Sequence, residues 1–323
     1  MNVMSRNGTG GLYEWRSIKE QPLWEESFNS VEKSNLLQSW AYGEAKGKVQ
    51  GWRVERIGIE SRGGLVAICQ VLFKRVIGLP LVVRINRGPL FIGASQLPEQ
   101  KGQVFRLLRS ILRLRWGVVS LIAPELDCTP ENAELLKSAG WRRRKGTGVR
   151  SAWIDLRPDE SDLLKGLAPK WRNQLNSAVR SGLSLEISSS PEEVGWLLQR
   201  HEEHMKEQKF GAPGYELLSQ FHSADPQNFL VLRAILANEP VAGVGIVKHG
   251  RAATYLVGWS SRDGRKLNAG NFLLWNGMLQ VRKLACLWFD LGGINEKQSQ
   301  GVARFKRGVR GAEYCLSGEW WTI

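Results

Sequence analysis

The same order of predicted elements occurs twice along the chain, and this repetition limits the fold more than any other feature. In each half, alternating apolar and polar residues predict a hairpin, which is followed by further strands and an amphipathic helix. The segments are residues 51–60, 65–75, 79–85, 88–93, 100–115 and 118–124 in the first half, and residues 229–236, 241–250, 252–260, 269–285 and 287–293 in the second. This combination is typical of a mixed α/β sheet. We therefore predict an α/β (α+β) fold with an internal duplication, in which each half is a mixed sheet flanked by helices.

The length of the chain agrees with this duplication, because 323 residues suit two domains of roughly 150 residues each. We place the first domain at residues 11–150 and the second at residues 151–311. A polar segment rich in charged residues, residues 158–224, is mostly helical in pattern, and we take it as an insertion within the second domain.

The charge balance indicates anionic partners. The chain has 45 Lys and Arg residues against 31 Asp and Glu residues, a formal net charge of +14. Such a surplus favours nucleic acid, nucleotide diphosphates or anionic lipid. Arg106, Arg109 and Arg113 share one side of a predicted helix, and residues 142–145 are all basic. A solvated helix face is the simpler explanation for the three arginines, and contact with phosphates is the alternative.

Several common enzyme classes lack their sequence signatures here. The chain has no glycine-rich phosphate loop ending in Lys-Ser/Thr, no dinucleotide-binding glycine fingerprint and no serine elbow. It also has no apolar run of the ~18–20 residues that span a bilayer, and its first residues lack the apolar core of a signal peptide. We therefore expect a cytoplasmic protein that does not hydrolyse nucleoside triphosphates or use NAD.

A metal site is not expected either. His201-Glu202-Glu203-His204 lacks the second histidine that a zincin carries four positions after the first, where this chain has Met205. The four cysteines are far apart and form no ligand spacing, and we expect reduced thiols at these positions: Cys69, Cys128, Cys286 and Cys315.

Four short motifs follow one another along the chain. They are Gln38-Ser39-Trp40 with Lys46, then Arg87-Gly88-Pro89, then Pro169-Lys170-Trp171-Arg172-Asn173, and finally Asp290-Leu291-Gly292-Gly293-Ile294 with Phe305-Lys306-Arg307-Gly308. Together and in this order, they resemble the FemABX family of peptidoglycan interpeptide-bridge aminoacyltransferases and their FemAB-like relatives, from about residue 24 to residue 320. The resemblance implies two tandem acyltransferase domains of the GNAT type. It also implies that the C-terminal strand, residues 312–323, returns to the first domain.

The resemblance further implies an activity. FemABX proteins transfer an amino acid from aminoacyl-tRNA to an amine of a peptidoglycan precursor, and so form an amide bond. It assigns Phe305 and Lys306 to the transfer site and Lys46 to the diphosphate of the precursor. The complete set of substrate-binding candidates is Trp40, Lys46, Arg172, Lys209, Gly292 and Gly293. Aminoacyl-tRNA would be a co-substrate, and no bound cofactor is expected.

The chemistry of such a transfer agrees with these residue types. An aminoacyl ester is already activated, so a neutral amine can attack it without a protein nucleophile. The protein then has to orient two anionic substrates and stabilise an oxyanion, and cations such as Lys46, Arg172 and Lys306 suit that work. A general base is harder to identify. Glu125 is a weak candidate at the end of the first-half strand, and we favour Asp290 as a structural cap of the Gly292-Gly293 turn.

Two other functions stay open. An acyl-CoA-dependent N-acyltransferase of exopolysaccharide or envelope metabolism would share the fold, although the stretch 265–270 lacks a glycine of the usual pyrophosphate signature. Backbone N–H groups at that helix start can still bind a pyrophosphate. A non-catalytic protein that binds RNA or anionic lipid head groups is the third function class. For the favoured function we expect a nucleotide- or lipid-linked cell-wall precursor as acceptor and a monomeric protein, and peripheral membrane contact stays open.

Overall fold

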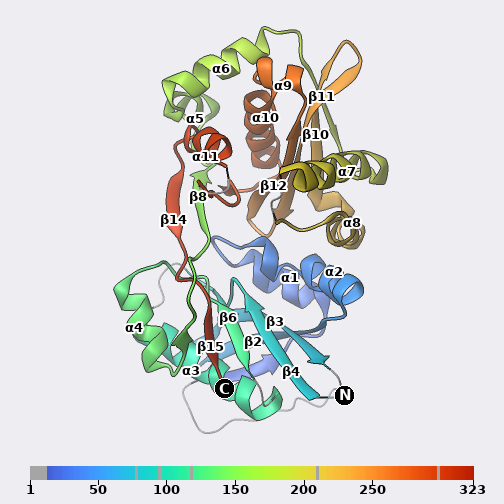
Figure 1. Cartoon of the computed structure of the whole chain (residues 1–323). Coiled ribbons are helices and arrows are strands. Elements are labelled where there is room, and N and C mark those ends of the chain that lie inside the picture. The colour runs from blue at the N-terminus through green and yellow to red at the C-terminus, as the bar shows by residue number, and fades with distance from the viewer. Residues whose placement is uncertain (1–12, 77–78, 94–96, 117–118, 209–210, 297–298) are drawn as a thin grey trace. The chain divides into compact units, whose positions relative to one another are not determined.

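The computed structural model describes residues 13–76, 79–93, 97–116, 119–208, 211–296 and 299–323. The chain divides into two compact units, which are described separately here (Figure 1). The first unit consists of Met1–Val149 and Cys315–Ile323, and the second of Arg150–Tyr314. None of the helices in these described ranges is long and apolar enough to cross a membrane.

The first unit is built on a mixed sheet with the strand order β1-β2-β3-β4-β6-β15-β7, in which β5 also pairs with β3. The strands are β1 (Tyr13–Ser17), β2 (Arg53–Ser61), β3 (Gly64–Val76), β4 (Leu79–Asn86), β5 (Leu90–Phe91), β6 (Ser120–Ala123), β7 (Arg142–Arg143) and β15 (Trp320–Thr322). The pair β4–β6 is parallel, because the long helix α3 connects these two strands. The short strand β15 comes from the far end of the chain and pairs with both β6 and β7.

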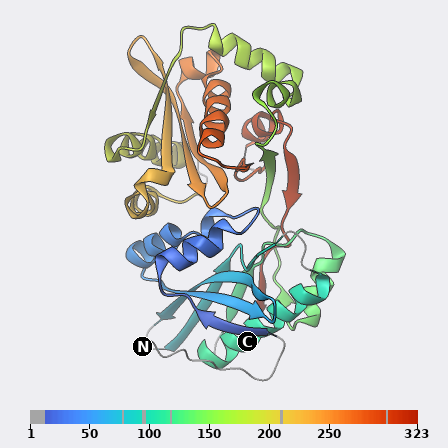
Figure 2. The ribbon, with the colours of Figure 1, turned by 180° about the vertical axis from the view of Figure 1, so that it is seen from behind.

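The helices of the first unit are α1 (Gln21–Asn29), η1 (Leu36–Gln38), α2 (Trp40–Gln50), α3 (Pro98–Trp116) and α4 (Pro130–Ser138). One core cluster joins the apolar side of α3 to the sheet, with Phe105 and Leu108 against Ile85, Ile122 and Trp320. A second cluster joins Trp24 and Phe28 of α1 to Ile68 of β3. Helices α1 and α3 therefore contact the sheet through different sets of sheet residues. Figure 2 shows both helices from behind.

The second unit contains a seven-stranded sheet with the order β14-β8-β13-β12-β11-β10-β9. Its strands are β8 (Arg150–Asp155), β9 (Ser184–Ser188), β10 (Phe229–Leu236), β11 (Glu239–His249), β12 (Ala252–Ser260), β13 (Trp288–Asp290) and β14 (Ala312–Cys315). Its helices are α5 (Glu160–Gly166), α6 (Pro169–Val179), α7 (Pro191–Gln208), α8 (Tyr215–Ala224), η2 (Pro226–Asn228), α9 (Arg262–Lys266), α10 (Ala269–Lys283) and α11 (Gln300–Arg307). The parallel pair is β12–β13, and α10 connects these strands as α3 connects β4 and β6.

Glycines in the central strand β11 allow helices to pack closely on the second sheet. A side chain at Gly243 would overlap Trp196 of α7, while the neighbouring Ile246 lies against Gly277 of α10. Leu273 and Met278 of α10 belong to the same core cluster as Ile246. Helices α7 and α10 thus contact β11 through different residues. Strand β13 belongs to the same sheet, which therefore supports the segment that follows β13.

The predicted α/β duplication is confirmed, since each unit has a mixed sheet with a helix between two parallel neighbouring strands. Two details differ from the sequence prediction. The segment 158–224 also contains β9, which pairs with β10 at the edge of the second sheet. The C-terminal segment 312–323 does not return as a whole to the first sheet, because β14 pairs with β8 of the second sheet and only β15 lies in the first.

Candidate functional site

A tight turn follows β13 in the second unit, and the buried carboxylate of Asp290 holds it. Asp290 is 1% exposed and accepts hydrogen bonds from three groups: the Gly292 backbone N–H at 3.0 Å, the Tyr314 hydroxyl at 2.8 Å and the Ser151 hydroxyl. Ser151 lies on β8 and Tyr314 on β14, so the carboxylate joins three strands at this end of the sheet. This arrangement agrees with the interpretation of Asp290 as a structural cap.

The two glycines of the turn have different requirements. Gly292 has a φ of +67°, and a Cβ at this position would overlap the carbonyl oxygen of Tyr255 on β12. Only glycine therefore fits position 292 without moving the turn. Gly293 is exposed, and a Cβ there would meet no atom within 4 Å. The carbonyl oxygen of Gly293 accepts a hydrogen bond of 2.8 Å from Nζ of Lys306, which connects the turn to α11.

Lys306 is unusual for a lysine because it is only 6% exposed. Its Nζ lies 5.0 Å from the centre of the Tyr255 ring, and burial lowers the pKa of Lys306 to about 8, against an opposing effect of the Asp290 charge. Burial also raises the pKa of Tyr255 to about 12, so that this phenol stays neutral. Lys306 is thus mainly an ammonium at pH 7, yet it can lose its proton near neutral pH.

Phe305, the neighbour of Lys306 in the predicted motif, packs α11 against two other helices. Its ring centre is 6.1 Å from that of Trp171 on α6, and its carbonyl accepts a 3.1 Å hydrogen bond from Nε1 of Trp171. On another side, the Phe305 ring lies 3.7 Å from the Cβ position of Gly270, in the first turn of α10. These contacts show that Phe305 and Trp171 position the helix that carries Lys306.

The two basic candidate residues of the segment 158–224 are Arg172 and Lys209, and the structure describes only Arg172. Arg172 follows Trp171 on α6, is partly exposed, and donates a 3.3 Å hydrogen bond to the carbonyl of Lys165. Lys209 lies outside the described residues. Lys306, Gly292 and Gly293 are therefore the predicted site residues that the second unit brings into direct contact.

Trp40 and Lys46 lie in the first unit, on α2. The ring of Trp40 is covered by the Arg56 guanidinium at 3.4 Å, and Arg56 also donates a 3.0 Å hydrogen bond to the Trp40 carbonyl. Nζ of Lys46 donates a 2.6 Å hydrogen bond to Oε1 of Gln50. Burial, together with the positive charge of Arg84 on β4, lowers the pKa of Lys46.

Sequence reasoning missed Arg84. This residue stands in an otherwise apolar strand, and that placement was a usable signal. Its guanidinium pairs with Glu319 and donates a 2.7 Å hydrogen bond to Oδ1 of Asn86, while its charge still acts on Lys46. The Glu319 carboxylate partly balances the charge that Arg84 places near Lys46.

The carboxylate of Glu125 is not available as a general base. It forms a two-point ion pair with Arg87, with distances of 2.8 Å and 2.6 Å, and both side chains are largely buried. Gln38 of the first motif donates a 2.7 Å hydrogen bond to the Asn86 carbonyl, next to Arg87. The first two sequence motifs thus contain structural contacts of the first unit.

In the described ranges, no three His, Cys, Asp or Glu side chains are grouped as they would be around a metal ion. His201 is 6% exposed on α7. Cys69 and Cys286 are buried thiols, and Cys128 is an exposed one.

Comparisons with known proteins agree with this fold. Residues 169–307 match the Acetyltransferase (GNAT) domain family. Across the whole chain, the structure resembles FemX, with a TM-score of 0.80 and 17% identity over 96% of this chain and 97% of that chain. No curated protein matches the chain in sequence.

Two further structures share the fold at lower similarity. L-PGS from Bacillus licheniformis has a TM-score of 0.57 and 14% identity, covering 94% of this chain and 91% of that chain. A tandem GNAT protein from the clavulanic acid biosynthesis pathway has a TM-score of 0.54 and 12% identity, covering 96% and 98%. The FemX-like tandem GNAT fold is therefore confirmed, and the domain match supports an acyltransferase.

Proposed function

We propose that this protein transfers an aminoacyl group from aminoacyl-tRNA to an amine of a cell-wall precursor. The observation that carries the proposal is the buried Lys306, hydrogen-bonded to the Gly293 turn in a GNAT domain, with its pKa lowered to about 8. Burial of a lysine ammonium costs free energy, and a pKa near neutral pH lets the amine gain or lose a proton. Such a lysine is typical of a site of proton transfer. The FemX-like fold supports the choice of an amine acceptor and an activated acyl donor.

The proposed reaction needs no covalent enzyme intermediate. The neutral amine of the acceptor attacks the ester carbonyl carbon, a C–N bond forms, and a tetrahedral intermediate results with a negative oxygen and a positive nitrogen. The C–O bond to the ribose then breaks. Lys306 gives its proton to the leaving ribose oxygen and, now neutral, takes the proton that the new amide nitrogen releases. A pKa of about 8 suits both transfers, because the ammonium predominates at pH 7 and the neutral amine is still accessible.

The acceptor side of the proposal rests on Lys46 and Arg84. Arg84 pairs with Glu319, and its positive charge still lowers the pKa of Lys46, so both side chains would attract an anion bound beside them. A diphosphate, as in a nucleotide- or lipid-linked precursor, carries charges that suit this pair. Replacement of Lys46 by alanine should therefore raise the acceptor concentration needed for half-maximal rate by about tenfold, as expected for a lost charge-assisted hydrogen bond.

An acyl-CoA donor is the second candidate, favoured by the GNAT domain match at residues 169–307. Helix α10 begins after Asn268, which has a φ of +56°. Nδ2 of Asn271 is buried in the same turn and has no hydrogen-bond partner in the described part of the chain. These features suit a pyrophosphate, which such a donor would bring.

One labelling experiment separates the two donors. The purified full chain is given either labelled aminoacyl-tRNA or labelled acyl-CoA, together with a nucleotide-linked peptide precursor that carries a free amine. We expect label in the precursor amide from aminoacyl-tRNA and none from acyl-CoA. Label from acyl-CoA alone would assign the second function, and binding of both without turnover would refute transfer.

A further inference from the structure

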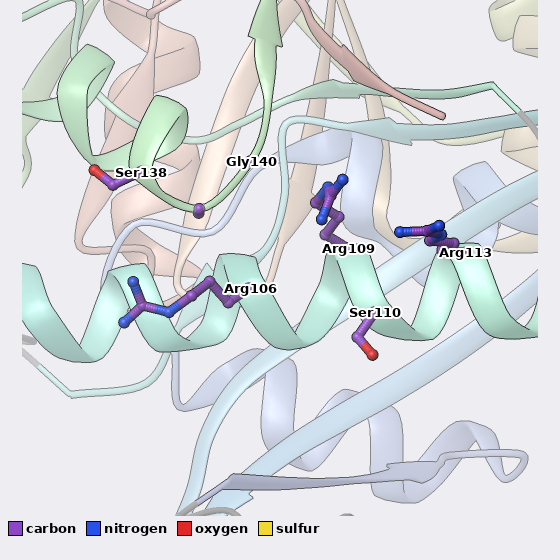
Figure 3. A pocket seen from close by; sticks show the side chains of 7 residues that line it. Arg106, Arg109, Ser110, Arg113, Ser138 and Gly140 are labelled. Atoms are coloured by element: carbon purple, nitrogen blue, oxygen red, sulfur yellow. The ribbon is translucent and has the colours of Figure 1, made fainter.

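The first unit has a pocket of about 560 Å³ whose lining is rich in arginine (Figure 3). It lies between α3 and the end of α4, and Arg106, Arg109 and Arg113 line it together with Ser138 and Gly140. None of the described residues that line it is acidic. The pocket is separate from Lys46 and Lys306, neither of which lines it, so the proposed transfer chemistry does not explain it.

The three arginines share a face because of their spacing along α3. Positions three and seven residues apart lie on the same side of a helix, and α3 is long enough to display all three. Figure 3 shows Arg109 and Arg113 on the side of α3 that faces Gly140, and Ser110 of the same helix also lines the pocket. At about 1.5 Å per residue, Arg106 and Arg113 are about 10 Å apart along the helix axis.

Arg109 is fixed in place, whereas its two neighbours are exposed. Nε of Arg109 donates a 2.9 Å hydrogen bond to Oγ1 of Thr322 on β15. Gly140 has a φ of +88°, and a Cβ there would lie 2.9 Å from the same Nε, so this glycine both ends α4 and makes room for Arg109. Arg106 and Arg113 are exposed. The fold therefore orders one guanidinium and leaves two able to meet a ligand.

Three guanidinium groups without an acidic lining residue repel one another, and a bound anion relieves this repulsion. Arginine also binds phosphate oxygens through two parallel hydrogen bonds. The three arginines extend over about 10 Å along the helix axis, and this spread suits an extended anion with several phosphates. The basic surface continues beyond the pocket onto β7, which pairs with β15. Arg142 of β7 lies 5.6 Å from the centre of the Trp321 ring on β15.

We propose that this pocket binds the phosphodiester backbone of RNA. The identity of that RNA as the aminoacyl donor rests on the proposed function. An RNA strand presents a row of phosphates that matches a row of arginines. The pocket lining offers no large apolar side chain that could enter a lipid layer. The observations therefore favour RNA over a membrane surface.

The test uses the full chain and a fluorescent, uncharged RNA hairpin with a single-stranded 3′ end, and it measures binding at several salt concentrations. The pocket variant is Arg106→Gln with Arg113→Gln. The control variant is Arg53→Gln with Arg62→Gln, which removes the same charge from exposed positions of the same unit. We expect the pocket variant to bind RNA at least tenfold more weakly and to lower the slope of log Kd against log salt by about 1.5. The control should change Kd less than threefold.

Three results would overturn the proposal: equal weakening in both variants, no weakening in the pocket variant, or loss of binding to phosphatidylglycerol vesicles with RNA binding unchanged. The assay involves no turnover, so it can fail independently of the proposed function. RNA binding that depends on the pocket, together with transfer from acyl-CoA alone, would support the pocket and refute the donor. Transfer from aminoacyl-tRNA with unchanged RNA binding in the pocket variant would support the donor and refute RNA binding by the pocket.

Discussion

At the residue scale, Lys306 combines burial with a position next to a carbonyl and a carboxylate. Its Nζ contacts the Gly293 carbonyl, while Asp290 acts on it only through its charge. Replacement of Lys306 by alanine removes the proton donor, and we expect single-turnover transfer to slow by about 100-fold or more. The matched control is Lys283→Ala, an exposed lysine at the end of α10. Transfer by Lys306→Ala at the rate of the control would refute the assignment.

The carboxylate of Asp290 gives a second prediction at this scale, which concerns pH. Its negative charge stabilises the ammonium of Lys306, so Asp290→Asn should lower the pKa of Lys306 further. Any loss of rate with rising pH should then begin at a lower pH than in the wild type. Tyr314→Phe is the control, because it removes one hydrogen bond to Asp290 and keeps the charge. Equal pH profiles for Asp290→Asn and the wild type would contradict this coupling.

The sequence located Lys306 only through its motif. Its helix, α11, is short and rich in arginine and lysine, a composition that predicts exposure. Burial of Lys306 results from contacts with β12 and the β13 turn, which lie more than ten residues away along the chain. Periodicity cannot show such contacts. The structural role of Asp290 was more accessible, because an aspartate before two glycines predicts a capped turn.

At the element scale, the turn after β13 allows a matched comparison of two neighbouring glycines. Gly292→Ala puts a Cβ against the Tyr255 carbonyl at a positive φ, and we expect it to lower the free energy of unfolding by about 2 kcal/mol or more. Gly293→Ala meets no atom within 4 Å and should change that free energy by less than about 0.5 kcal/mol. Urea unfolding measures both. Similar losses for the two variants would show that the turn is not held at Gly292.

The long helices and hairpins could be predicted from sequence, but the short edge strands could not. The prediction of the 269–285 helix agrees with α10, and the 229–250 hairpin agrees with β10 and β11. By contrast, β7 consists of two exposed arginines, and it is a strand because β15 pairs with it. Likewise, β9 lies between helical segments and pairs with β10. Pairing partners, rather than local propensity, determine such strands.

At the scale of the whole molecule, the first unit depends on residues from the end of the chain. Strand β15 lies between β6 and β7, and Trp320 is 0% exposed in the core of that unit. Trp320→Ala should lower the stability of the first unit by about 3–5 kcal/mol. Hydrogen exchange should increase in β4 and β6 and stay unchanged in β11 and β12. Ile323→Ala, at a residue that is 67% exposed, is the control; exchange that rises equally in both sheets would contradict the expected localisation.

The duplication of the molecule was predictable because hydrophobic patterns report sheets and helices that recur in one order. The return of the C-terminal strand to the first unit was predicted from the family resemblance alone, since residues 320–322 carry no local signal for β6 or β7 as partners. A pocket such as that of α3 and α4 is also hidden in sequence. The spacing of Arg106, Arg109 and Arg113 predicted a shared face, and only the fold shows that the end of α4 encloses it.

The most direct test of the account is the pH dependence of single-turnover transfer in the wild type and in Lys306→Arg. If the Lys306 ammonium donates the proton, the wild-type rate falls above a pH of about 8, in line with the pKa of the buried amine. Arginine keeps its charge across this range, so the variant, though slower, should show no such fall. A decline of the same shape in both proteins, or none in the wild type, would contradict the central role of Lys306.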